Sequence, residues 1–367
     1  DRLDPTAESL LDAARLGGDY LIRSVKPNGR FVYSYRPESD SEPEQYNILR
    51  HAGTVYAMLE LYEVTKNPKL LAAAERAIGY LLAQIKPSRD AGSEAACVVE
   101  RDTVKLGGNA LAALALCKYI EVTGERSHLP TVRRLGQWMR SVQAESGEFT
   151  VHKMRYTGGE VAPFRSAYYP GEAILALVRM HAADPEGGWL DVAERGARWI
   201  VEVRDSRVPG SALFHDQWLL YSLGELCRLR PGRGLFRHAL RLSDAVVVAQ
   251  HIAPPHPDWV GGYHRPPRST PTATRTEGLC AVYSLVRQAG YRDRAVRMLD
   301  AVRLGTVFVL QMQFRPESVM YFDDPQRALG GIHAGLTNYE VRIDYVQHCI
   351  SALLGYRRIL LQEQADD

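Results

Sequence analysis

The sequence lacks the features that mark several common classes of protein. Its five cysteines are an odd number without close spacing, which argues against a disulfide framework and against a CxxC metal site. No apolar run approaches the roughly 20 residues that span a bilayer, and the first residues lack the basic and apolar halves of a signal peptide. We therefore expect no membrane partner and a reducing, cytoplasmic location, while the missing initiator methionine leaves a removed leader open.

The sequence also has almost no net charge. Its 45 Lys and Arg nearly balance its 43 Asp and Glu, so the formal charge is only +2. Such a balance creates no overall field that would draw the chain to nucleic acid, and we expect no nucleic-acid partner. Hydrophobic residues make up 46% and charged residues 24%, which is typical of a globular protein with a sizeable core.

Nearly chargeless stretches alternate with amphipathic ones along the whole chain. Residues 106–117 carry no charge, whereas residues 129–142 place their apolar side chains on one helical stripe. Connections from buried to surface stretches are short, and connections in the other direction are long and contain strand-like pieces. The pattern predicts a single all-α domain over residues 1–367, with six inner and six outer helices and the long loops on one face.

This alternation resembles the six-hairpin toroid superfamily, the (α/α)6 barrels, and the resemblance covers essentially the whole chain. The superfamily includes glycoside hydrolases, unsaturated uronyl hydrolases, sugar 2-epimerases of the N-acylglucosamine type and polysaccharide lyases. Related toroids include terpene cyclases, protein prenyltransferases and lanthionine cyclases. The resemblance implies a carbohydrate-active enzyme, a glycoside hydrolase or a sugar epimerase, because the fold alone selects no single chemistry.

Polar residues at the starts of the inner helices are the candidates for a site, since parallel inner helices would bring their first turns and the long loops to one mouth. The candidate catalytic residues are His51, Glu172, Asp216, Glu277, Asp344 and His348. The candidate substrate-binding residues are Arg50, Tyr168, Tyr169, Trp218, Arg275, Tyr339 and Arg342. Aromatic rings with polar tips suit the apolar face and the hydroxyl rim of a sugar.

Paired carboxyl groups would carry a hydrolase reaction, with one acting as acid and one as carboxylate. Asp216 with Asp344 is the first choice, and Glu277 and Glu172 are the alternatives. Each has a structural explanation as well, because an acidic residue in a first helical turn is favoured by the helix dipole. Thr274 and Glu277 also have the spacing of a capping box.

An epimerase would instead use two bases, for which His51 and His348 are the candidates. Each lies in an apolar helical stretch, where a histidine is also commonly a hydrogen-bonded core residue.

Arginines at three inner-helix starts favour an anionic ligand. Arg50, Arg275 and Arg342 could bind a carboxylate through bidentate contacts, so we expect an acidic sugar or oligosaccharide as the substrate. The alternative is internal pairing, above all between Arg342 or Arg50 and Asp344, which is flanked by apolar residues.

Two further alternatives stay open at this point. One is a toroid that binds a glycan or peptide in its funnel without catalysis. The other is a zinc enzyme of the prenyltransferase type, but Cys280 with His348 or Cys349 supplies only part of a tetrahedral ligand set. We therefore expect no metal and no cofactor.

Overall fold

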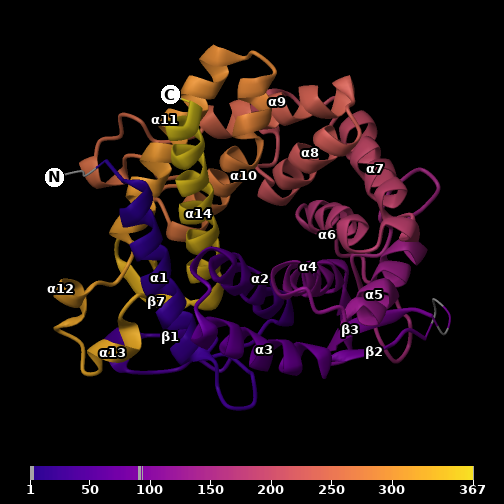
Figure 1. Ribbon diagram of the computed structural model, residues 1–367, viewed down its shortest axis with the longest axis horizontal. Helices are drawn as coiled ribbons and strands as arrows, with labels where there is room; N and C mark the ends of the chain where they lie inside the picture. Colours follow the sequence, from indigo (N-terminus) through magenta and orange to yellow (C-terminus); the bar gives the residue numbers. More distant parts are fainter. Residues whose placement is uncertain (1–3, 90–91, 93, 367) are drawn as a thin grey trace. The chain divides into compact units, whose positions relative to one another are not determined.

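The computed structural model describes residues 4–89, 92 and 94–366, and helices dominate this part of the chain (Figure 1). The twelve long helices among these residues are α1 Ala7–Ser24, α2 Ile48–Thr65, α3 Pro68–Leu82, α4 Leu106–Thr123, α5 Leu129–Ser141, α6 Tyr169–Ala183, α7 Trp189–Trp199, α8 Gln217–Leu229, α9 Arg233–Val248, α10 Ser269–Gln288, α11 Arg292–Gln311 and α14 Ile343–Asp366. The all-α class and the number of long helices predicted from the sequence are confirmed.

Burial alternates along the helices as the sequence pattern predicts. Every residue of α4 from Leu106 to Ile120 is buried, whereas α5 buries one stripe and exposes its charged side. The ends follow local chemistry. Thr6 caps α1 by accepting a hydrogen bond from the backbone N–H of Ser9, and Gly124 ends α4 in the left-handed conformation at a φ of 77°.

The chain divides into two compact units, and we describe each by itself. Unit 1 comprises Asp1–Tyr46, Glu60–Ala77 and Ser243–Asp367, and unit 2 comprises Asn47–Leu59 and Ile78–Leu242. In unit 1, α14 packs against α1 and α10, so the first and last long helices lie side by side (Figure 1). In unit 2, α6 packs against α4, α7 and α8. A single domain over residues 1–367 stays a prediction.

Short strands occupy the connections that lead into buried helices. In unit 1, an antiparallel sheet has the order β1-β7-β6, with β1 at Ser34–Tyr35, β6 at His333–Gly335 and β7 at Asn338–Arg342. In unit 2, a sheet of order β2-β3-β4-β5 contains Ile85–Pro87, Ala96–Glu100, Thr103–Lys105 and Lys153–Arg155. Strand β7 ends directly before α14, and β4 ends directly before α4. The sheets therefore fix where these two helices begin.

The long connection before β6 contains two single-turn helices, α12 at Pro316–Val319 and α13 at Pro325–Ala328. The part of the chain that the structure describes contains no helix long and apolar enough to cross a bilayer. All five cysteines carry free thiols. Cys97, Cys117, Cys227 and Cys349 are buried, and Cys280 is half-buried.

One predicted helix start is wrong. Helix α10 begins at Ser269, so Thr274 and Glu277 lie inside the helix and form no capping box. The side chain of Thr274 bonds to the carbonyl of Pro271 within the same helix. Capping therefore does not explain the carboxylate of Glu277, which is 1% exposed.

Two adjacent glycines in the first turn of α4 give a matched test of packing in unit 2. A Cβ at Gly107 would overlap Oε2 of Glu172 and lie 2.6 Å from Tyr169 Cδ1, whereas the nearest atom to a Cβ at Gly108 is 3.9 Å away. We expect Gly107→Ala to lower the free energy of unfolding by about 1–3 kcal/mol through overpacking. Gly108→Ala should raise it by up to about 1 kcal/mol, because alanine favours the helix. Urea denaturation measures both, and equal effects would contradict the close approach at Gly107.

Candidate active site

A buried acid–base pair lies in unit 1, where α10 packs against α14. Nδ1 of His348 and Oε1 of Glu277 are 3.0 Å apart, a hydrogen-bonding distance. Burial raises the pKa of Glu277, the neighbouring His348 opposes the shift and the charge of Glu60 adds to it, so that the pKa is about 7. The sequence predicted both residues as catalytic candidates, and the structure brings them together.

A second carboxylate borders the same face of α14. Ser351, three residues after His348, donates a hydrogen bond of 2.6 Å from Oγ to Oε2 of Glu60. Glu60 lies in the apolar run of α2 and is 9% exposed. Sequence reasoning missed Glu60, although a single acidic residue in an otherwise apolar helix stretch was a usable signal.

Arg342 and Asp344 pair with each other at the junction of β7 and α14. Nε of Arg342 lies 2.5 Å from Oδ1 of Asp344, and Nη2 lies 2.9 Å from Oδ2, so the contact is bidentate. Asp344 is 4% exposed, and this pairing is the internal alternative that the sequence left open for it. The contact occupies two donors of Arg342 that an anionic ligand would otherwise use.

Arg275 also has partners inside unit 1. Its guanidinium lies over the ring of Tyr263, 5.1 Å from the ring centroid, and Nη1 donates to the carbonyl of Pro271 at 2.9 Å. Tyr339 lies in β7, with its ring 5.4 Å from that of His333, and is 40% exposed. Tyr339 is therefore more accessible to a ligand than Arg275.

Two of the candidate carboxyl groups are buried in unit 2. Glu172 lies in the first turn of α6, and Asp216 caps α8 by accepting a hydrogen bond of 3.1 Å from the backbone N–H of Leu219. Among the described residues, Oε2 of Glu172 and Oδ2 of Asp216 are buried and have no hydrogen-bond partner. A Cβ on Gly171 would lie 2.7 Å from Oδ2 of Asp216, so the backbone of α6 closely approaches this carboxyl group.

Both of these carboxyl groups hold protons more tightly than usual. Burial raises the pKa of Glu172, and the charge of Asp216 raises it further. Burial also raises the pKa of Asp216 to about 7, against the opposing charge of Arg204. Helix capping was one explanation for both acids. The side chain of Asp216 does cap the start of α8, whereas the side chain of Glu172 makes no capping hydrogen bond at the start of α6.

A charged network that the sequence did not reveal lies beside Asp216. Arg204 ends a π-helix, Ile200–Arg204, and its Nε and Nη2 lie 2.7 and 2.9 Å from the two oxygens of Asp205. Nε2 of His238 lies 3.2 Å from Oδ2 of Asp205. Although burial opposes the shift, the hydrogen bonds from Arg204 and the neighbouring His238 lower the pKa of Asp205 to about 2. The arginine–aspartate pair therefore remains charged at neutral pH.

The other candidates of unit 2 lie in packed surroundings. His51 is fully buried in α2, with its ring centroid 5.3 Å from that of Tyr80. Burial and the charge of Glu172 raise the pKa of Tyr169, and Arg50 lowers it, so these side chains share one electrostatic environment.

The two remaining aromatic candidates of unit 2 pack against neighbouring rings. Tyr168 stacks edge-on with Phe214 at 4.6 Å, and Trp218 is only 4% exposed. Trp218 therefore belongs to the core of unit 2, and little of its ring is open to a ligand.

The structure groups the candidates by unit. Unit 1 contains Arg275, Glu277, Tyr339, Arg342, Asp344 and His348, and unit 2 contains Arg50, His51, Tyr168, Tyr169, Glu172, Asp216 and Trp218. No group of three metal-ligating side chains suited to a metal ion occurs within residues 4–89, 92 and 94–366. That the protein needs no metal stays a prediction.

Comparisons with known proteins identify the fold. No family model matches the sequence, and no curated protein matches it. Among solved structures, a D-mannose isomerase is similar with a TM-score of 0.70 and 14% identity, over 96% of this chain and 97% of that one. A cellobiose 2-epimerase from Spirochaeta thermophila gives 0.65 and 13%, over 93% and 94%. A family 76 glycoside hydrolase, a mannosidase from Bacteroides thetaiotaomicron, gives 0.66 and 12%, over 98% and 100%. At these identities the likeness shows the fold alone, which is that of the (α/α)6 toroids.

Proposed function

We propose that the chain is a carbohydrate-active enzyme that moves a proton at a sugar carbon next to a carbonyl group, as epimerases and aldose–ketose isomerases do. The observation that carries the proposal is the buried contact between His348 and Glu277. The fold is shared with a D-mannose isomerase and a cellobiose 2-epimerase, which supports a sugar substrate.

The pair supplies the groups that this reaction needs. A Glu277 carboxylate that accepts a hydrogen bond from Nδ1 of His348 holds the ring in one tautomer, with Nε2 able to accept a proton. His348 would take the proton from carbon 2, and the electrons of the broken C–H bond would move onto the carbonyl oxygen. Return of a proton to carbon 2 from the opposite face re-forms the carbonyl at carbon 1 and gives an epimer. Return of a proton to carbon 1, with transfer of the proton of the carbon 2 hydroxyl to the oxygen on carbon 1, forms the carbonyl at carbon 2 and gives a ketose. His51 as the second base stays a prediction.

Proton exchange with solvent tests the proposal directly. The protein is incubated in D2O with a panel of neutral and acidic reducing sugars, and NMR follows the signal of the proton on carbon 2. We expect this signal to disappear for at least one sugar, with or without accumulation of an epimer or ketose. If no sugar of the panel exchanges, the proton-transfer proposal is wrong.

Glycosidic-bond hydrolysis is the second candidate, and a specific observation favours it. Glu172 and Asp216 are two buried carboxyl groups with raised pKa values, and one oxygen of each has no hydrogen-bond partner among the described residues. A raised pKa suits the general acid of a glycosidase. Asp344 fits less well, because Arg342 occupies both of its oxygens. Release of reducing ends from mannans and uronic-acid glycans, lost in Glu172→Gln, would support hydrolysis.

The acidic character of the substrate is the finer part of the proposal, and Arg342 tests it. Lysine keeps the charge but cannot form both hydrogen bonds to Asp344, so we expect Arg342→Lys to lower the free energy of unfolding by about 1.5–3 kcal/mol. If Arg342 serves only Asp344, the preference for a uronic acid over the matching neutral sugar should not change. Unchanged stability with a lost preference for the uronic acid would instead place the ligand's carboxylate on Arg342.

A further inference from the structure

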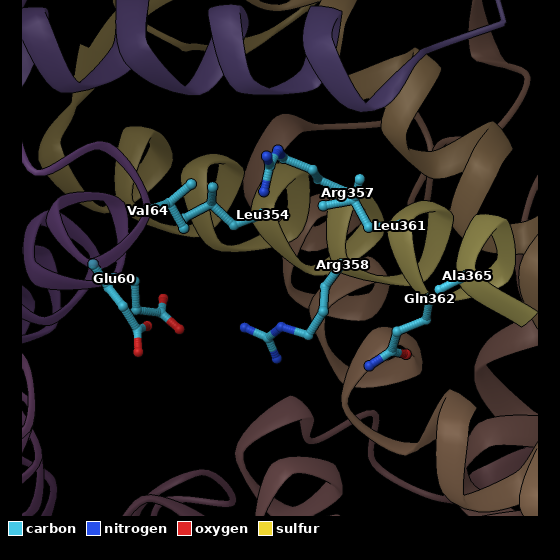
Figure 2. A pocket seen from close by; sticks show the side chains of 9 residues that line it. Glu60, Val64, Leu354, Arg357, Arg358, Leu361, Gln362 and Ala365 are labelled. Carbon is cyan, nitrogen blue, oxygen red and sulfur yellow. The ribbon is translucent and has the colours of Figure 1, made fainter.

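A cavity of about 270 Å³ lies in unit 1 between the second half of α2 and the last turns of α14 (Figure 2). Glu60 and Glu63 line it from α2, and Arg357, Arg358 and Gln362 line it from α14. Figure 2 shows the guanidinium of Arg358 extending from α14 into the space that Glu60 borders. Leucine and valine side chains complete the wall. The Glu277–His348 pair is not among the lining residues.

The chemistry of the wall selects a class of ligand. Two carboxylates and two guanidinium groups cancel, so the lining offers no net charge to hold an anion or a cation. It does offer acceptors on one helix and donors on the other, together with an apolar surface. Hydroxyl groups both donate and accept, and therefore match such a wall.

We propose that this cavity binds one small neutral polyhydroxylated molecule of monosaccharide size, at a site separate from the Glu277–His348 pair. The volume is slightly below the roughly 300–1,000 Å³ of typical ligand pockets, which fits a single sugar ring rather than an oligosaccharide. The ligand's hydroxyl groups donate to Glu60 and Glu63 and accept from Arg357 and Arg358.

Glu60 links this cavity to the candidate active site. It lines the cavity and also accepts the hydrogen bond from Ser351, three residues after His348 on α14. A molecule that binds Glu60 therefore contacts the residue to which Ser351 donates its hydrogen bond, and Ser351 lies one helical turn from His348. This placement suits a site whose occupant modulates the reaction without taking part in it.

Methyl α-D-mannopyranoside and methyl α-D-glucopyranoside are suitable probes, because a methyl glycoside cannot open to a carbonyl form and cannot undergo exchange at carbon 2. Their binding to the full chain is measured by calorimetry for wild type, Arg358→Met and Arg297→Met. Arg358 and Arg297 are both exposed arginines, and only Arg358 lines the cavity. We expect Arg358→Met to weaken binding roughly ten- to a hundredfold, as for lost hydrogen bonds from a charged donor, and Arg297→Met to bind as wild type does.

Crystals soaked in the same glycosides locate the site, and density between Glu60 and Arg358 is the expected result. The proposal is overturned if neither glycoside binds at concentrations that saturate a millimolar site, if Arg358→Met binds as tightly as wild type, or if the density lies only at His348. The exchange of the carbon 2 proton is a separate measurement. Its absence would contradict the proposed function and leave the result for the cavity intact.

Discussion

Replacing His348 with asparagine should abolish the exchange of the carbon 2 proton, with a loss of roughly 10²–10⁴ in kcat, the usual contribution of a general base. Asparagine can still donate a hydrogen bond to Glu277, so the fold and the affinity for the sugar should change little. His256→Asn is the matched control, because His256 is an exposed histidine outside the pair. NMR exchange rates give kcat, and circular dichroism confirms that each variant folds. Retention of full exchange by His348→Asn would exclude His348 as the base.

The pH profile separates a catalytic pair from a structural one. Burial raises the pKa of Glu277 to about 7, and Glu277 must be ionised to orient a neutral His348 that takes up a proton. The exchange rate should therefore fall as the pH decreases below about 7. Glu277→Gln accepts the same hydrogen bond without titrating, so this variant should lose the part of the acid limb that Glu277 contributes. A profile that is the same in both proteins would assign Glu277 a packing role.

The fold was readable from the sequence because each helix carries its own burial pattern. The chargeless stretch of α4 predicts a helix buried on all sides, and the single apolar stripe of α5 predicts a helix buried on one side. The start of α10 was missed because its first turns, Ser269–Thr274, contain β-branched threonines and Pro271, which lower helix propensity. Proline is nevertheless tolerated in a first turn, where its missing N–H has no partner to lose.

The candidate site was readable only in part, because pairing depends on how separate helices pack. Glu277 and His348 were each predicted as candidates, but they lie 71 residues apart, and only the contact of α10 with α14 makes them a pair. Arg342 and Asp344 are two residues apart, so their pairing could be foreseen as an alternative. The Arg204–Asp205 pair could not be predicted from the sequence, because the π-helix that ends at Arg204 continues α7 directly and has no hydrophobic pattern that distinguishes it from α7.

The buried acids of unit 2 should make the protein less stable as the pH rises. Asp216 has a pKa of about 7 in the folded chain, against an ordinary value of 3.8, and the pKa of Glu172 is raised as well. Between the ordinary and the folded pKa values, the folded state binds more protons than the unfolded state. The stability that these protons supply is complete below about pH 4 and is lost as the pH rises through 7.

Asp216→Asn should remove this loss, because asparagine never ionises and can still cap α8 through its side-chain oxygen. At 1.36 kcal/mol per pKa unit, the shift of Asp216 from 3.8 to about 7 corresponds to a contribution on the order of 4 kcal/mol. We therefore expect the variant to match wild type near pH 4 and to exceed its free energy of unfolding by that amount at pH 8. Urea denaturation at several pH values gives the comparison, with Glu186→Gln as a control at an exposed acid of the same unit. Parallel curves for Asp216→Asn and wild type would show that Asp216 is ionised in the folded protein throughout this range, and the hydrolytic candidate would then lose its general acid.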